Sequence, residues 1–118
     1  MKHARILLGG QELEISVDEQ GNVTDGAGQD LSIDLNSDAI TWLPPVKEPG
    51  TIFALGINYA DHATELAFEP PKEPLIFIKH ANCLTGHKQV SYRPDNIDYQ
   101  HYECELVAVI GKSGKNIK

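Results

Sequence analysis

Two glutamates, Glu103 and Glu105, lie two residues apart within the largely apolar stretch Tyr102–Ile110. Alternation along a strand would place both carboxylates on the same face. Two ionised carboxylates side by side repel each other, and a hard cation such as Mg²⁺ relieves that repulsion. His101 is a candidate third ligand or a partner that orients the ligands. The alternative is that the strand frays at Glu103 and that water solvates both acids.

The five residues that follow, Leu106–Ile110, are apolar without a break. Consecutive side chains of a strand point to opposite faces, so an unbroken apolar run is typical of a strand buried on both sides. We therefore expect Tyr102–Ile110 to be a strand inside a sheet. Cys104, on the face opposite the glutamates, is expected to be a packed thiol.

A second pair, His62 and Glu65, lies in a segment rich in helix formers, Ala60–Ala67, with Asn58 as the expected N-cap. Residues three apart on a helix are neighbours on one face. An imidazole oriented by a carboxylate is the basic unit of a general base. The alternative is an exposed pair without a chemical role.

Three basic residues are candidates to bind an acidic substrate. Lys79 follows the apolar run Leu75–Ile78, which predicts a short buried strand, and Arg93 begins an expected turn. Lys88 lies between them. A lysine just past a buried strand can meet an anionic group, although such lysines are usually solvated.

The residues before the prolines predict a small β element. Gly9-Gly10, between the apolar runs Ala4–Leu8 and Gln11–Val17, is typical of a two-residue hairpin turn. Scattered apolar residues over Leu31–Trp42 suggest further short strands. The element has few large apolar residues, so we expect little stability from it alone.

Pro44-Pro45 stiffens the chain and removes two backbone donors, which favours a domain boundary there. We expect an N-terminal β domain over residues 1–45 and a second domain over residues 46–118. Thr51–Leu55 and Leu75–Ile78 predict short strands in the second domain. The expected fold class is therefore mainly β (α+β).

The composition excludes several classes of protein. The chain has 118 residues and a formal net charge of −7, and its ten basic residues form no cluster, which argues against nucleic-acid binding. The early apolar run Ile6–Leu8 is too short for a signal peptide or a membrane span. Two cysteines without metal-site spacing do not require an oxidising compartment, so the cytoplasm is expected.

Three segments, in this order, resemble the fumarylacetoacetate hydrolase family: Gly56–Glu65, Glu73–Lys79 and Tyr102–Gly111. The resemblance covers roughly Pro49 to Lys118. It implies a mixed β-sandwich or roll around a Mg²⁺ or Mn²⁺ site, of which this chain would hold the N-terminal part. Met1–Pro45 is similar to the small N-terminal extension of the isomerase/decarboxylase members of the homoprotocatechuate pathway.

The resemblance also implies roles for individual residues. Glu103 and Glu105 match two acidic metal ligands, and His62 with Glu65 matches the pair that activates water or relays protons. Lys79 matches a lysine near the pocket.

Two features depart from the family pattern. Members use a further acidic ligand downstream of the two glutamates, and the sequence stops at Lys118 before reaching it. His80 stands where many relatives have proline. On this basis we expect the second domain to be truncated and the 118-residue chain to be inactive on its own.

The implied substrates are acids with a 2-oxo or 2-hydroxy-enol group, whose adjacent oxygens chelate the metal while it stabilises an enolate. We expect isomerisation or decarboxylation of a small dicarboxylic enol acid in aromatic catabolism, by a homodimer. One alternative is hydrolysis of a carbon–carbon bond in acylpyruvate-like or fumarylacetoacetate-like compounds. Another is an inactive metal-binding or assembly module.

Overall fold

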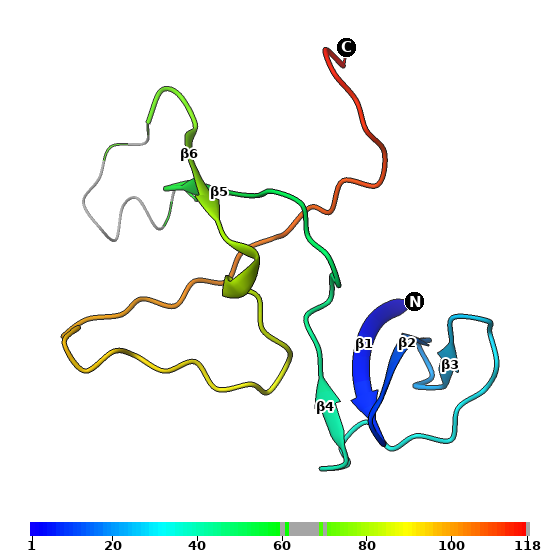
Figure 1. The fold of residues 1–118 in the computed structure, drawn as a ribbon. Helices are drawn as coiled ribbons and strands as arrows, with labels where there is room; N and C mark the ends of the chain where they lie inside the picture. Colours follow the sequence, from blue (N-terminus) through cyan, green and yellow to red (C-terminus); the bar gives the residue numbers. More distant parts are fainter. Residues whose placement is uncertain (60, 62–68, 70, 118) are drawn as a thin grey trace.

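The computed structural model describes residues 1–59, 61, 69 and 71–117. Within this part the regular structure is almost entirely β, in two antiparallel sheets, with one short 3-10 helix, η1 (Ala81–Cys83) (Figure 1). The expected mainly-β class is confirmed. The expected helix over Ala60–Ala67 lies, apart from Asp61, outside the described residues.

The predicted N-terminal hairpin is confirmed. β1 (Lys2–Leu8) pairs antiparallel with β2 (Gln11–Val17) along their whole length. Gly9 and Gly10 join them with φ of 58° and 83°. A two-residue turn with positive φ at both positions matches the right-handed twist of the strands, and glycine adopts it without a steric penalty.

Two short strands complete the first sheet in the order β3-β2-β1-β4. β4 (Ile40–Trp42) fulfils part of the expectation of further strands, whereas β3 (Val23–Asp25) was not predicted. Leu31, Ile33 and Leu35 do not form strands, and they pack instead against the edge of the core. Their apolar side chains are used for packing without the backbone pairing that defines a strand.

Each strand of the first sheet contributes one buried side chain to the core: Ile6, Ile15, Val23 and Ile40. Ile6, on β1, one of the two inner strands, is completely buried. Burial of a side chain of this size stabilises a fold by about 1.5–3 kcal/mol. The core is therefore small, but all four strands share it.

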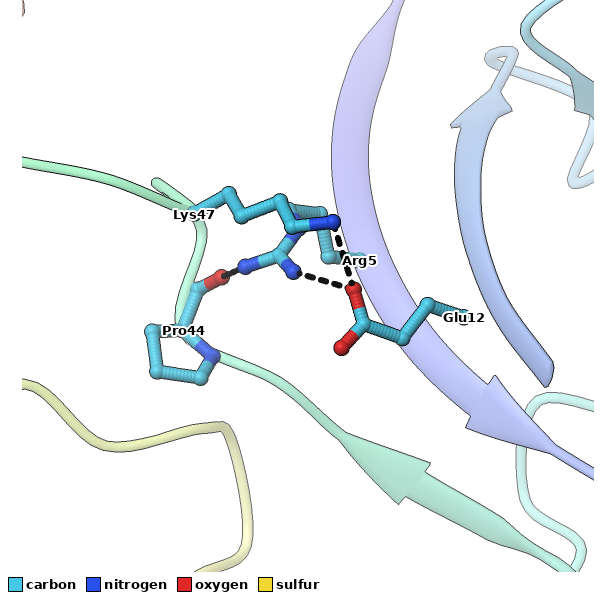
Figure 2. Close-up of polar contacts among 4 residues, drawn as sticks. All are labelled: Arg5, Glu12, Pro44 and Lys47. Carbon is cyan, nitrogen blue, oxygen red and sulfur yellow. Dashed lines mark hydrogen bonds and ion pairs between the residues drawn. The ribbon is translucent and has the colours of Figure 1, made fainter. Parts of the chain in front are cut away.

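A polar cluster fixes the chain that leaves β4 (Figure 2). The nearly buried Arg5 guanidinium donates hydrogen bonds to the Pro44 carbonyl and to Glu12 Oε2, both at 3.0 Å. Lys47 Nζ lies 3.3 Å from the same Glu12 oxygen. The Leu43 N–H donates to the Arg5 carbonyl at 2.9 Å. Arg5 thus holds the proline-containing segment against the first sheet.

A second contact joins the first sheet to the later chain. Gly86 is buried, and a Cβ placed on it would lie 1.8 Å from the carbonyl oxygen of Trp42. The neighbouring His87 ring meets the Trp42 ring edge-on, with 5.2 Å between centroids. Because the close atom belongs to the backbone, only a residue without a side chain fits at position 86.

The second sheet consists of β5 (Ile52–Gly56) and β6 (Leu75–Lys79), paired antiparallel from Ile52 opposite Lys79 to Gly56 opposite Leu75. Both strands were predicted. The predicted burial of Leu75–Ile78 is wrong, because every residue of β6 is exposed. A sheet of two strands covers little of its own surface, and no third strand pairs with it in the described chain.

The predicted buried strand Tyr102–Ile110 is also wrong. This segment, orange to red in Figure 1, forms no strand, and all its residues are exposed, Leu106 to 91%. Cys104 is exposed as well, so the expectation of a packed thiol fails with it. An apolar run shows which faces a strand could bury, but a strand forms only where a neighbour pairs with its backbone. Among the described residues no strand does so.

The dimensions of the molecule agree with this open arrangement. Its radius of gyration is 18.2 Å, whereas a compact chain of this length has about 13.5 Å. No helix in the described ranges is both long and apolar enough to cross a membrane. The proposed division at residue 45 stays a prediction.

Candidate functional site

A pocket of about 420 Å³ lies beside the second sheet. It is bounded by β5, by the turn that follows β5, by the residues at the end of β6 and by the segment that begins at Glu105. The polar side chains on its walls are Asn58, Tyr59, Lys79, Cys83 and Glu105.

The pocket brings together two residues that the sequence singled out from separate motifs, Lys79 and Glu105. Lys79 is the last residue of β6, and its Nζ lies 6.0 Å from the centroid of the Phe77 ring. Such a cation–π contact favours a position of the ammonium over the apolar strand. One positive and one negative side chain therefore line a largely apolar hollow, as in many small-molecule sites.

The turn after β5 supplies Asn58 and Tyr59. It passes through Ile57, whose φ of 55° is in the left-handed region. This conformation is a genuine outlier for a β-branched residue, of the kind that costs on the order of 1–3 kcal/mol. Strained backbone of this type gathers at functional sites. The turn places both polar side chains on the pocket wall.

The Tyr59 hydroxyl crosses to the segment that carries Glu105. It accepts a hydrogen bond from the backbone N–H of Leu106 at 3.2 Å. This contact joins residues 47 positions apart in the sequence. It links the turn after β5 to a segment that has no strand ladder of its own in the described chain.

Sequence reasoning did not assign Asn58, Tyr59 or Cys83 to the site. Asn58 was interpreted only as a helix cap, although it lies in the turn just after a predicted strand and its glycine, where binding residues are common. Cys83 reaches the pocket through η1, one short turn after β6. No pattern in the sequence marks that turn.

Other predicted site residues lie elsewhere. The Arg93 guanidinium donates to the Ile97 carbonyl within its own turn. The His101 ring meets the Tyr99 ring edge-on, with 4.4 Å between centroids. Neither residue, nor Glu103, is among the described residues that line this pocket. The predicted pair His62 and Glu65 lies outside the described residues.

The side-chain oxygens available here meet part of what a hard metal ion requires. Glu103 and Glu105 offer carboxylate oxygens, and Mg²⁺ is usually bound by one or two carboxylates together with several waters. In the described ranges, however, no three His, Cys, Asp or Glu side chains gather in a way that could hold a metal ion. The two glutamates are therefore at most a partial set of ligands.

Comparison with known proteins shows which family the region around this pocket resembles. The family model described as fumarylacetoacetate (FAA) hydrolase C-terminal matches residues 51–118. The 4-hydroxyphenylacetate degradation bifunctional isomerase/decarboxylase of Salmonella dublin is 61% identical over 77 residues, which are 65% of this chain and 18% of that protein. The homoprotocatechuate catabolism bifunctional isomerase/decarboxylase of Escherichia coli is 61% identical over 75 residues, 63% of this chain and 18% of that protein.

A more distant relative is named for a different activity. The mitochondrial oxaloacetate tautomerase FAHD2A of Homo sapiens is 40% identical over 79 residues, 67% of this chain and 25% of that protein. The chain thus spans between 18% and 25% of the length of these relatives. The resemblance seen in the three sequence motifs is confirmed, and the chain belongs to the fumarylacetoacetate hydrolase family.

Proposed function

We propose that residues 51–118 form part of the catalytic site of a divalent-metal-dependent isomerase/decarboxylase. Its substrate would be a small 2-oxo or 2-hydroxy-enol dicarboxylic acid from aromatic catabolism. The observation that carries the proposal is the pocket that unites Lys79 and Glu105 inside the family-matched region. The relatives at 61% identity support the reaction type. The oxaloacetate tautomerases support the substrate class, since oxaloacetate is a 2-oxo dicarboxylic acid.

Lys79 is the proposed partner of a substrate carboxylate. Its ammonium is a compact positive charge on the pocket wall, and the charge would attract an anion into a hollow that is otherwise largely apolar. Asn58 can donate and accept hydrogen bonds beside it and so help to orient the substrate. Arg93 is the proposed partner for a second, distal carboxylate.

Glu103 and Glu105 are the proposed ligands of Mg²⁺ or Mn²⁺, with His101 as an orienting neighbour. When bound, the ion supplies positive charge that stabilises negative charge developing on adjacent substrate oxygens. Two carboxylates leave most of an octahedral site to water and substrate, so we expect weak binding of the ion by this chain alone.

His62, oriented by Glu65, is the proposed proton-transfer group. A neutral imidazole can remove a proton from carbon or oxygen near neutral pH and return it elsewhere on the substrate. Isomerisation and decarboxylation share this requirement, because both move a proton to or from a carbon next to a carbonyl group. We further propose a cytoplasmic homodimer.

A binding experiment tests the site in the chain itself. Calorimetry with Mg²⁺ and oxalate, which mimics the two adjacent oxygens of a 2-oxo acid, should detect a ternary complex. Lys79→Met should weaken oxalate binding, and Glu105→Gln should weaken Mg²⁺ binding. Lys112→Met, which removes a charge outside the pocket lining, is the matched control. Mg²⁺ binding without any ternary complex would favour a metal-binding or assembly module instead.

A chimera tests the reaction. The aligned segment of the Escherichia coli relative would be replaced by the corresponding residues of this chain, and turnover of oxaloacetate and of an acylpyruvate would be measured with Mg²⁺. We propose that the chimera isomerises or decarboxylates its substrate, whereas the isolated 118-residue chain turns over neither compound. Cleavage of the acylpyruvate alone would instead identify a hydrolase. Substantial turnover by the isolated chain would show that two acidic ligands suffice.

A further inference from the structure

The Leu106 N–H, which donates to the Tyr59 hydroxyl, belongs to the peptide bond that joins Glu105 to Leu106. The six atoms from the Cα of Glu105 to the Cα of Leu106 lie close to one plane. A contact that fixes the Leu106 N–H therefore also fixes the Cα from which the Glu105 side chain projects. No strand ladder holds residues 102–110 in the described chain, so a side chain that binds this backbone has a large influence on its position.

We propose that Tyr59 is a positioning residue, which holds Glu105 at the pocket by binding the backbone N–H of Leu106. The 3.2 Å hydrogen bond and the presence of both Tyr59 and Glu105 on the pocket wall carry this inference. It deepens the proposed function and rests on it, because it assigns Tyr59 an effect on a proposed metal ligand.

The turn that presents Tyr59 supports the same inference. Ile57 keeps a left-handed conformation that a β-branched residue avoids, so the surrounding structure must hold it there. Gly56 ends β5 next to this turn and faces Leu75 of β6 closely enough that an added Cβ would lie 2.9 Å from the Leu75 side chain. The paired strands thus provide a fixed base from which Tyr59 reaches the Glu105 segment.

The chemistry of a phenol suits this role. A hydroxyl has one proton to donate and two lone pairs to accept. Acceptance of the Leu106 N–H leaves the Tyr59 proton available for another oxygen in the pocket. Replacement of Tyr59 by phenylalanine removes the acceptor and preserves the ring, so packing is disturbed very little.

Amide hydrogen exchange measures the contact directly. A single hydrogen bond is worth about 1 kcal/mol, so Tyr59→Phe should accelerate exchange at the Leu106 amide roughly 5-fold. Tyr92→Phe is the matched control, since Tyr92 is exposed and is not among the pocket-lining residues. An unchanged Leu106 exchange rate in Tyr59→Phe would overturn the proposal. Unchanged signals from Ile6 and Ile15 would show that the first sheet is intact.

The ¹³C signal of the Glu105 carboxyl group measures the positioning, because it reports the surroundings of that group with or without an ion. It should shift in Tyr59→Phe and not in Tyr92→Phe. A signal that stays unchanged while Leu106 exchange accelerates would show that the contact does not position Glu105, and it would overturn the proposal.

A double-mutant cycle then separates positioning from an independent effect. Tyr59→Phe should weaken Mg²⁺ binding several-fold in the parent chain and have no further effect in Glu105→Gln. Equal losses in both backgrounds would mean that Tyr59 acts without Glu105, contrary to the proposal. If the parent chain binds no Mg²⁺, the proposed metal site fails, and the exchange rate and the carboxyl signal still decide the role of Tyr59.

Discussion

The strands of the second sheet are richer in apolar residues than the strands of the first sheet, and yet their side chains are far less buried. In the first sheet, each of four strands contributes a buried side chain. In the second, β5 and β6 contribute none, and Phe53 and Ile78 are each 66% exposed. The apolar pattern of a strand therefore determines which side chains can be buried. Whether they are buried depends on how many neighbouring elements cover them.

The polar contacts of the two regions also differ. Local hydrogen bonds order the turns of the first sheet, as where the Asp18 carboxylate accepts the N–H groups of Gln20 at 2.9 Å and Asn22 at 2.8 Å. The Asn22 side-chain amide donates a further bond to Asp18 Oδ2 at 2.7 Å, and this bond, followed by the backbone bonds, holds the pKa of Asp18 below its ordinary value. In the family-matched region the contact between Tyr59 and Leu106 spans 47 positions. The first region combines such local bonds with distant ones, such as that from Arg5 to Pro44, whereas the contact across the pocket of the second region is distant in sequence.

The largest expected effect concerns chemistry, which we assign to the second region alone. In the chimera with the Escherichia coli relative, His62→Ala should lower the catalytic rate by about 10²–10⁴-fold, the usual contribution of a general base. Metal affinity should be nearly unchanged, as measured by calorimetry. Loss of the metal together with activity would instead make His62 a ligand. Glu65→Gln should act in the same direction but more weakly, since it only orients the imidazole.

Much of the fold was predictable where the signal is local. Gly9-Gly10 between two apolar runs predicts the β1–β2 hairpin, and short β-branched or aromatic runs predict β5 and β6. β3 has three residues, too few for an alternating pattern to be recognised. The burial of β6 and the strand at Tyr102–Ile110 were predicted wrongly, because burial and pairing require neighbours that a local pattern does not reveal.

The candidate site was predictable only in its family motifs. Lys79 and Glu105 were selected from separate segments, and the pocket joins them. Tyr59 and Cys83 were not selected, since their positions depend on a strained turn and on a 3-10 turn that no sequence pattern marks. The roles of Glu103 and of the pair His62 and Glu65 stay predictions.

The second largest effect compares one apolar truncation in each region. Ile6→Ala removes a completely buried side chain from the inner strand β1 and should lower the free energy of unfolding by about 2–5 kcal/mol. Leu106→Ala removes an exposed side chain and should change it by less than about 0.5 kcal/mol. Urea denaturation followed by circular dichroism measures both. A large loss in Leu106→Ala would show that this segment is covered in solution.

A third substitution tests the contact that joins the regions. Gly86→Ala places a methyl group against the Trp42 carbonyl, so the loop must shift, and we expect a loss of about 1–3 kcal/mol. Gly111→Ala is the control, because a Cβ there meets no atom within 4 Å. Thermal unfolding with Trp42 fluorescence reports the loss. Equal stability of the two variants would mean that the loop does not rest on β4.

The smallest effect concerns the pH dependence of the polar cluster in Figure 2. The Lys47 ammonium, and to a smaller extent the Arg5 guanidinium, lower the pKa of Glu12 from its ordinary value of 4.5. A carboxylate whose pKa is lower in the folded state stabilises the fold above the unfolded-state pKa, and this contribution disappears as the pH falls through the folded-state pKa. Glu12→Gln should therefore be less stable than the parent chain at neutral pH, with a difference that shrinks as the pH falls below 4.5.

Glu19→Gln removes an exposed carboxylate from outside the cluster and serves as the control. The difference should be small and should decrease in high salt, because Glu12 and Lys47 are both exposed and their attraction is screened. Urea denaturation at several pH values measures it. A difference between Glu12→Gln and the parent that stays constant from neutral pH to well below 4.5 would show that Glu12 acts through packing and not through its charge.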